Sequence, residues 1–197
     1  SVKALAKINL GLDVVRKRED GYHEVRMVMQ TIHLFDRLEI SKNTSGEITM
    51  ETNLSFLPTN ENNLVYKAAK LLQDEFAIKD GVHVWLHKYI PVAAGMAGGS
   101  TDAAAVLYGM NQIFDLGLTR EELMERGVKI GADVPYCIMR GTALAEGIGE
   151  KLSKLPPMVK CPVLIAKPQI SVSTKFVYEN LKLGSDMVHP DIDRLVA

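Results

Sequence analysis

The sequence predicts an α+β fold. Residues 4–15 alternate apolar and polar side chains, a period of two that indicates a β-strand. Residues 62–76 repeat Leu, Ala and Phe three and four positions apart, which is typical of an amphipathic helix. Strand-like segments precede helical ones and alternate with them irregularly, which favours α+β over a doubly wound parallel sheet.

The N-terminal third is predicted to consist mostly of strands. Lys-Arg-Glu-Asp-Gly at 17–21 has the composition of a turn, so the first strand should form a hairpin with the next one. Residues 25–40 should hold one or two strands, with a break near Asp36. A loop at 43–47 and a strand at 48–51 come next.

Helices become frequent in the middle of the chain. We expect Asn62 to cap the 62–76 helix, and Val82 to Ile90 to form an alternating strand. An alanine-rich helix should run from about Ser100, its capping residue, to Phe114. Thr119 and Glu122 then have the spacing of a capping box, for a helix that ends near Lys129.

The remainder is predicted to be mixed. Residues 131–135 read as a turn, and two strands are expected at about 136–146, split near Gly141. Pro156 and Pro157 indicate a hinge, followed by a short buried strand at 163–166 and a helix at 174–182. We therefore expect one domain at 1–155 and the beginning of a truncated second α/β domain at 156–197, which stops within a helical pattern.

Composition narrows the function classes. The chain has 197 residues, 47% hydrophobic and 24% charged, with a net charge of −1. This balance gives no general attraction to nucleic acid or anionic membranes, and no apolar run approaches the ~18 residues of a membrane span. Cys137 and Cys161 lack disulfide or zinc-site spacing, so we expect reduced, mostly buried thiols in a cytoplasmic protein. His83 and His87 suit no metal set, and no metal-ligating residues are predicted.

The most informative segment is the loop at 91–105, Pro-Val-Ala-Ala-Gly-Met-Ala-Gly-Gly-Ser-Thr-Asp-Ala-Ala-Ala. Its small residues let a ligand approach the backbone, and the free amides of the following helix are suited to an anion such as phosphate. A simple tight turn is the alternative. The loop is neither a Walker A motif, since no Lys precedes Ser100, nor a Rossmann fingerprint.

Three segments together resemble the GHMP family of small-molecule kinases (galactokinase, homoserine kinase, mevalonate kinase and phosphomevalonate kinase). They are Ala-Lys-Ile-Asn-Leu at 6–10, the loop at 91–104 and Gly-Ala-Asp-Val-Pro at 131–135. The resemblance implies the N-terminal domain of that family, a fold like the second domain of ribosomal protein S5. Lys-Arg-Glu-Asp-Gly-Tyr-His-Glu at 17–24 is similar, more narrowly, to the kinases of 4-diphosphocytidyl-2-C-methyl-D-erythritol.

The resemblance implies a reaction and its catalytic residues. The reaction is ATP-dependent phosphorylation of the 2-hydroxyl of this cytidyl alcohol in non-mevalonate isoprenoid synthesis, with Mg²⁺ expected alongside ATP. Asp133 would be the general base, although Asp in such a segment also stabilises turns. Lys7 would pair with it and stabilise the developing alkoxide, unless its face of the strand is solvated. Asn9, two residues on, leaves the same face.

The same resemblance implies a set of binding residues. Those expected at ATP are Asn63, Leu64, Lys88, Pro91, Gly95, Met96, Ala97, Gly98, Gly99, Ser100 and Thr101. Those expected at the cytidyl substrate are Asn9, Tyr22, His23, Thr174 and Tyr178, with His23 at the base edge and Tyr178 on a face of the base.

Two alternatives remain at this point. The chain departs from the family in lacking a third glycine-rich motif, and in carrying Ala93, Ala94 and Ala97 where glycines are common. Another small-molecule kinase of the family, or a catalytically inactive nucleotide-binding fragment, is therefore an alternative to the proposed reaction. The sequence leaves the oligomeric state open.

Overall fold

The computed structural model describes residues 1–168, 170, 173–184 and 187–197. The strands are β1 (Val2–Lys17), β2 (His23–Asn43), β3 (Ile48–Thr52), β4 (Gly81–His87), β5 (Thr142–Glu146) and β6 (Lys151–Lys154). The helices are α1 (Leu64–Glu75), α2 (Gly98–Ile113), α3 (Arg120–Val128), α4 (Val134–Met139), α5 (Thr174–Asn180) and α6 (Ile192–Val196).

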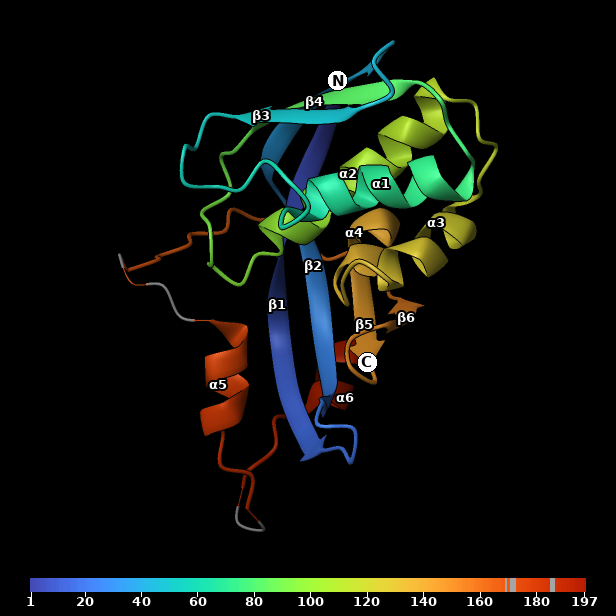
Figure 1. Cartoon of the computed structure of the whole chain (residues 1–197). Coiled ribbons are helices and arrows are strands. Elements are labelled where there is room, and N and C mark those ends of the chain that lie inside the picture. The colour runs from blue at the N-terminus through green and yellow to red at the C-terminus, as the bar shows by residue number, and fades with distance from the viewer. Residues whose placement is uncertain (169, 171–172, 185–186) are drawn as a thin grey trace.

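One mixed sheet organises the molecule, as the α+β prediction requires. Its order is β3-β4-β2-β5-β6, with β1 paired to β2. β1 and β2 form a long antiparallel hairpin, while β3 and β4 run parallel. Figure 1 shows α1 to α4 gathered beside one end of this hairpin, which extends well beyond them to α6.

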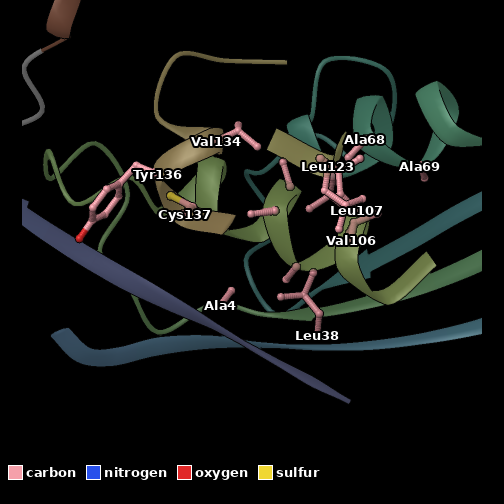
Figure 2. Packing of buried hydrophobic residues seen from close by; sticks show 14 of the residues in the cluster. Ala4, Leu38, Ala68, Ala69, Val106, Leu107, Leu123, Val134, Tyr136 and Cys137 are labelled. Atoms are coloured by element: carbon pink, nitrogen blue, oxygen red, sulfur yellow. The ribbon is translucent and has the colours of Figure 1, made fainter. Parts of the chain in front are cut away.

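The core lies between these helices and the sheet. Val106 and Leu107 of α2, Leu38 of β2 and Leu123 of α3 are at most 3% exposed and meet there (Figure 2). Small residues let α2 approach the sheet closely. A Cβ placed on Gly109 would lie 2.4 Å from Cδ1 of Ile40 on β2, so a larger residue at this crossing would require the Ile40 side chain to move.

Two predictions about strands were wrong in the body of the fold. β2 is continuous and has no break at Asp36, whose fully buried carboxylate is held by neighbouring amides and an ammonium group. The segment expected as a strand from residue 136 is helix α4 up to Met139. Pro135 is tolerated near the helix start, and Arg140 and Gly141, both at positive φ, end the helix before β5.

The helices agree better with the sequence. α3 has the predicted capping box, with both reciprocal hydrogen bonds between Thr119 and Glu122. α1 is capped by Asn63 rather than Asn62. α5 confirms a helix in the predicted region, although it ends at Asn180.

The segment after β6 differs from its prediction. Residues 163–166 form no strand, and Leu164 is 97% exposed. Cys161 is exposed as well, so only Cys137 is the buried thiol that we expected. β6 itself had no signal in the sequence. In the part of the chain that the structure describes, none of the helices has the length and apolar character needed to cross a membrane.

Candidate active site

The loop before α2 has an unusual backbone. Ala93, Gly95 and Ala97 all adopt positive φ, at 54°, 69° and 56°. Left-handed conformations are unfavourable for alanine, and here they occupy two positions where the resembled family commonly has glycine. Ala97 is the N-cap of α2 and makes no side-chain capping bond, so the prediction that Ser100 caps this helix was wrong. Ser100 lies in the first turn instead.

The start of α2 presents unpaired amides. The first hydrogen bond of the helix runs from the Thr101 amide to the Ala97 carbonyl, at 2.8 Å. The amides of Gly98, Gly99 and Ser100 therefore precede the helical ladder, and they have no hydrogen-bond acceptor among the described residues. Unpaired amides and the positive end of a 16-residue helix favour a bound anion.

The space around the loop is partly open. No described atom lies within 4 Å of a Cβ built on Gly95, whereas one on Gly99 would meet Cδ1 of Leu64 at 3.5 Å. Leu64, expected beside the nucleotide, thus lies next to the loop. Pro91, Gly95 and Gly99 are exposed. Met96 turns its side chain into a small apolar cluster with Ala6 and Ile90, so only its backbone is available to the site.

Three residues expected at ATP use their side chains within the protein. The Thr101 hydroxyl is buried and donates to the Leu5 carbonyl at 2.8 Å, which ties α2 to β1. The Asn63 side chain caps α1 by accepting from the Val65 amide at 2.9 Å. The Lys88 side chain is only 4% exposed and is engaged by two carboxylates. A direct side-chain contact from Thr101 or Lys88 to a nucleotide would need these bonds to break.

Lys7 and Asp133 meet beside the loop. Lys7 Nζ lies 3.6 Å from Asp133 Oδ2 and donates to Asn9 Oδ1 at 3.2 Å. The Lys7 side chain is 6% exposed and that of Asp133 is 32% exposed, so the ammonium is buried while the carboxylate reaches solvent. The Lys7 amide donates to the Met96 carbonyl at 3.2 Å. This bond fixes the position of Lys7 relative to the loop at 91–101, which we call the phosphate loop.

The Asp133 side chain does not stabilise the turn before α4 by a capping hydrogen bond. It occupies the N-cap position of α4, yet its carboxylate makes no capping hydrogen bond. Apart from its contact with Lys7, the Asp133 side chain therefore keeps hydrogen-bonding capacity for a bound molecule. Asp133 and burial together raise the pKa of Cys137, burial being the larger cause, so this nearby thiol remains neutral and is no nucleophile.

Tyr136 holds α4 in place, a role that the sequence did not reveal. Its hydroxyl donates to the Gly141 carbonyl at 2.7 Å and lies 3.1 Å from the Thr31 hydroxyl of β2. Burial raises the pKa of Tyr136 to about 12, so the hydroxyl stays protonated at neutral pH. Its place in the apolar run at 134–138 gave no sign of this bond.

The residues expected at the cytidyl group come from distant parts of the chain. The rings of His23, at the start of β2, and Tyr178 of α5 lie with centroids 5.0 Å apart and tilted by 31°. Burial and the charge of Asp133 raise the pKa of Tyr178, which places its hydroxyl in the field of the catalytic candidate. Tyr22 is 61% exposed. The Thr174 side chain lies outside the part of the chain that the structure describes.

The described residues contain no group of three His, Cys, Asp or Glu side chains arranged to hold a metal ion. The donor set at the loop instead consists of backbone amides, the Ser100 hydroxyl and the Lys7 ammonium. Such donors suit an anion such as a phosphate group.

Comparison with known proteins identifies the family of this chain. Residues 63–141 match the model of the GHMP kinases N terminal domain. A 4-diphosphocytidyl-2-C-methyl-D-erythritol kinase of Lachnoclostridium phytofermentans is 62% identical over 196 residues, which is 100% of this chain and 67% of the relative. The kinase of the same name from Lachnospira eligens is 60% identical, over 99% of this chain and 68% of its own length.

Solved structures give the same result. A crystal structure of 4-(cytidine 5'-diphospho)-2C-methyl-D-erythritol kinase matches with a TM-score of 0.80 and 33% identity, over 99% of this chain and 69% of the other. The mevalonate kinase of Methanococcus jannaschii, at 15% identity and a TM-score of 0.61 over 79% of this chain and 55% of its own, shares the fold. The chain belongs to the 4-diphosphocytidyl-2-C-methyl-D-erythritol kinase family of the GHMP kinases.

Proposed function

We propose that this protein transfers the γ-phosphoryl group of ATP to the 2-hydroxyl of 4-diphosphocytidyl-2-C-methyl-D-erythritol, a step of non-mevalonate isoprenoid synthesis. One observation carries the proposal: a buried lysine, whose backbone amide is hydrogen-bonded to a loop with unpaired amides, lies 3.6 Å from a partly exposed carboxylate. An acceptor activated by the carboxylate would thus lie beside a phosphate held by the loop. Relatives 60% and 62% identical over nearly the whole chain bear this kinase name.

Asp133 is the general base of the proposed reaction. Its carboxylate takes the proton of the 2-hydroxyl while the oxygen forms a bond to the γ-phosphorus and the bond to the bridging oxygen of ADP breaks. Lys7, buried beside it, stabilises the negative charge that develops on the attacking oxygen. Asn9 holds the Lys7 ammonium through its side-chain oxygen and so orients it.

The loop amides of Gly98, Gly99 and Ser100 bind the polyphosphate in this proposal, with Leu64 against the nucleotide. Mg²⁺ accompanies ATP and neutralises charge on its phosphates. Since the described residues hold no carboxylate cluster for a metal, its ligands would be mostly phosphate oxygens and water.

The cytidine base would contact His23, Tyr22 and Tyr178. The two rings of His23 and Tyr178 already touch, at 5.0 Å between centroids. A base inserted between them would need about 7 Å, twice the thickness of a ring, so α5 would have to shift. A base stacked on the exposed Tyr22, with His23 at its edge, requires no such movement.

We place the reaction in the cytoplasm, which is supported by the two unpaired cysteines, Cys137 and Cys161.

A substrate panel tests the proposal. A coupled assay for ADP is run with the cytidyl alcohol, mevalonate, homoserine and galactose as acceptors, and binding of ATP and of each acceptor is measured separately. We expect turnover with the cytidyl alcohol alone. Turnover with another alcohol would identify a different GHMP kinase, and binding of ATP without any turnover would identify a nucleotide-binding fragment.

A further inference from the structure

A buried charged cluster, Asp36 with Lys88 and Asp102, lies beneath the start of α2. Asp36 on β2 is 0% exposed, Asp102 on α2 is 2% exposed and Lys88, directly after β4, is 7% exposed. The Lys88 ammonium contacts Oδ2 of Asp36 and lies 2.8 Å from Oδ2 of Asp102. The reaction proposed above uses none of these three side chains, although burying three ionisable groups is costly.

The cluster fixes the entrance to the phosphate loop. Oδ1 of Asp36 accepts from the amides of Tyr89 and Ile90, at 2.5 and 2.8 Å. The backbone amide and carbonyl of Lys88 are both bonded to the Asn53 side chain, at 2.7 and 3.1 Å. The chain therefore leaves β4 in one fixed direction toward the loop.

The same cluster supports the far end of the loop. Lys88 Nζ lies 3.0 Å from the place that a Cβ on Gly98 would occupy, so the ammonium sits directly against the first residue of α2. The same ammonium also pairs with the carboxyl group of Asp102, which lies on α2 as well. Lys88 thus connects the entrance of the loop, β2 and the helix whose amides face the anion.

The charges of the cluster do not balance if both carboxyls are ionised. The two oxygens of Asp36 accept from three N–H donors, the Lys88 ammonium and the amides of Tyr89 and Ile90. Oδ2 of Asp102 accepts from Lys88, and its Oδ1 is buried without a partner among the described residues. Burial is the main cause that raises the pKa of Asp102 to about 8; Asp36 adds to the rise and Lys88 opposes it. At neutral pH Asp102 therefore carries the proton.

We propose that Asp36, Lys88 and Asp102 position the phosphate loop for the nucleotide, and that a second negative charge in this cluster weakens nucleotide binding. The inference rests on the proposed function, since it assigns these residues to the ATP half of the site. They are positioning residues, because each acts through the loop and none touches the reacting atoms.

The charges that face Asp102 determine how nucleotide binding should change with pH. Lys88 and Asp36 contact it, and the Cys137 thiol of α4 lies within its field but stays neutral. When Asp102 loses its proton above pH 8, a negative charge appears beneath the positive end of α2. That charge opposes the helix dipole and repels the polyphosphate.

The test measures binding against pH. Dissociation constants are determined by calorimetry between pH 7 and 9.5 for an imido analogue of ATP and, separately, for the cytidyl alcohol. For the unaltered protein we expect the dissociation constant of the ATP analogue to rise about three- to tenfold over this range. The dissociation constant of the cytidyl alcohol should change less than about twofold. Asp102→Asn, which stays neutral, should remove the rise. Asp115→Asn, an exposed change beyond the other end of α2, should keep it.

A second variant tests positioning at fixed pH. Asp36→Asn loses the charge that holds Lys88, so at pH 7 we expect at least about tenfold weaker binding of the analogue and unchanged binding of the cytidyl alcohol. A rise that persists in Asp102→Asn, or a parallel change for both ligands, would overturn the inference. If Asp36→Asn fails to fold by circular dichroism, the Asp102→Asn profile decides. Failure of the unaltered protein to bind any nucleotide would instead contradict the proposed function.

Discussion

At the scale of single residues, the two candidate catalytic side chains differ in how far they are exposed to solvent. The Lys7 side chain is buried, with 6% of it exposed, whereas Asp133 is partly open to solvent. This asymmetry fits their proposed roles, because the base must reach a proton on a bound alcohol while the ammonium gains strength from exclusion of water.

Asp133→Asn should reduce kcat by about 10²- to 10⁴-fold, since the amide cannot accept the proton of the alcohol. Binding of ATP should change little, because Asp133 contacts no loop amide. The check is a coupled ADP assay together with calorimetry of ATP, and Asp115→Asn is the matched control for the chemical change. A variant with near-normal kcat would show that Asp133 is not the base.

His23→Ala should weaken binding of the cytidyl substrate about three- to tenfold while ATP binding stays within about twofold, because the lost hydrogen bond to the base edge is worth ~0.5–1.5 kcal/mol. His33→Ala, an exposed change on the same strand, serves as the control. Separate titrations of the two ligands measure the difference. Equal weakening of both would argue against a role in base recognition.

At the scale of elements, α2 carries both the phosphate loop and much of the core. Its alanines and Gly109 let the helix lie directly on β2. The position of its N-terminus is therefore set by packing along its length, not by a side-chain cap.

Gly109→Val should lower the free energy of unfolding by about 1–3 kcal/mol, because the new side chain would collide with Ile40. Gln112→Val introduces the same residue at an exposed position of the same helix and should change stability by less than about 0.5 kcal/mol. Urea titrations of both variants provide the comparison. A Gly109→Val variant as stable as the unaltered protein would show that the Ile40 side chain moves aside at little cost.

At the scale of the whole molecule, we propose that the domain boundary lies at residues 155–156. Beyond β6, the Leu155 amide donates to the Thr142 carbonyl of β5 and the Met158 amide donates to the Thr142 hydroxyl, at 2.9 and 3.1 Å. Residues 156–168 form no helix or strand and are largely exposed. α6 returns to the hairpin, where Arg26 of β2 bonds the Asp193 carboxylate at 2.8 Å.

Brief trypsin treatment should therefore cut first at the exposed Lys160 or Lys167 and leave residues 1–155 resistant, because local opening concentrates where few contacts hold the backbone. Mass spectrometry of the first fragments identifies the cut. First cleavage in the turn at 17–21, with 156–168 intact, would contradict this boundary.

The sequence predicted more of the fold where a signal is local. The capping box at Thr119 is complete within four residues, and the alternation of β1 needs only its own side chains. The apolar run of α4 is short, so its pattern cannot distinguish helix from strand, and β6 is too short and polar to give any pattern. In the site, motif residues identified the loop and the Lys7–Asp133 pair, but gave no sign that the Thr101 hydroxyl turns away from the anion to Leu5.

The sequence by itself determined the α+β class, the small-residue loop that opens α2 and the placement of Lys7 and Asn9 on one face of a strand, because each depends on neighbours along the chain. Tertiary structure decided which of these groups are buried, which carboxylate meets which ammonium, and that His23 and Tyr178 lie together. Burial and charge pairing arise between segments far apart in sequence, so only packing of the whole chain sets them.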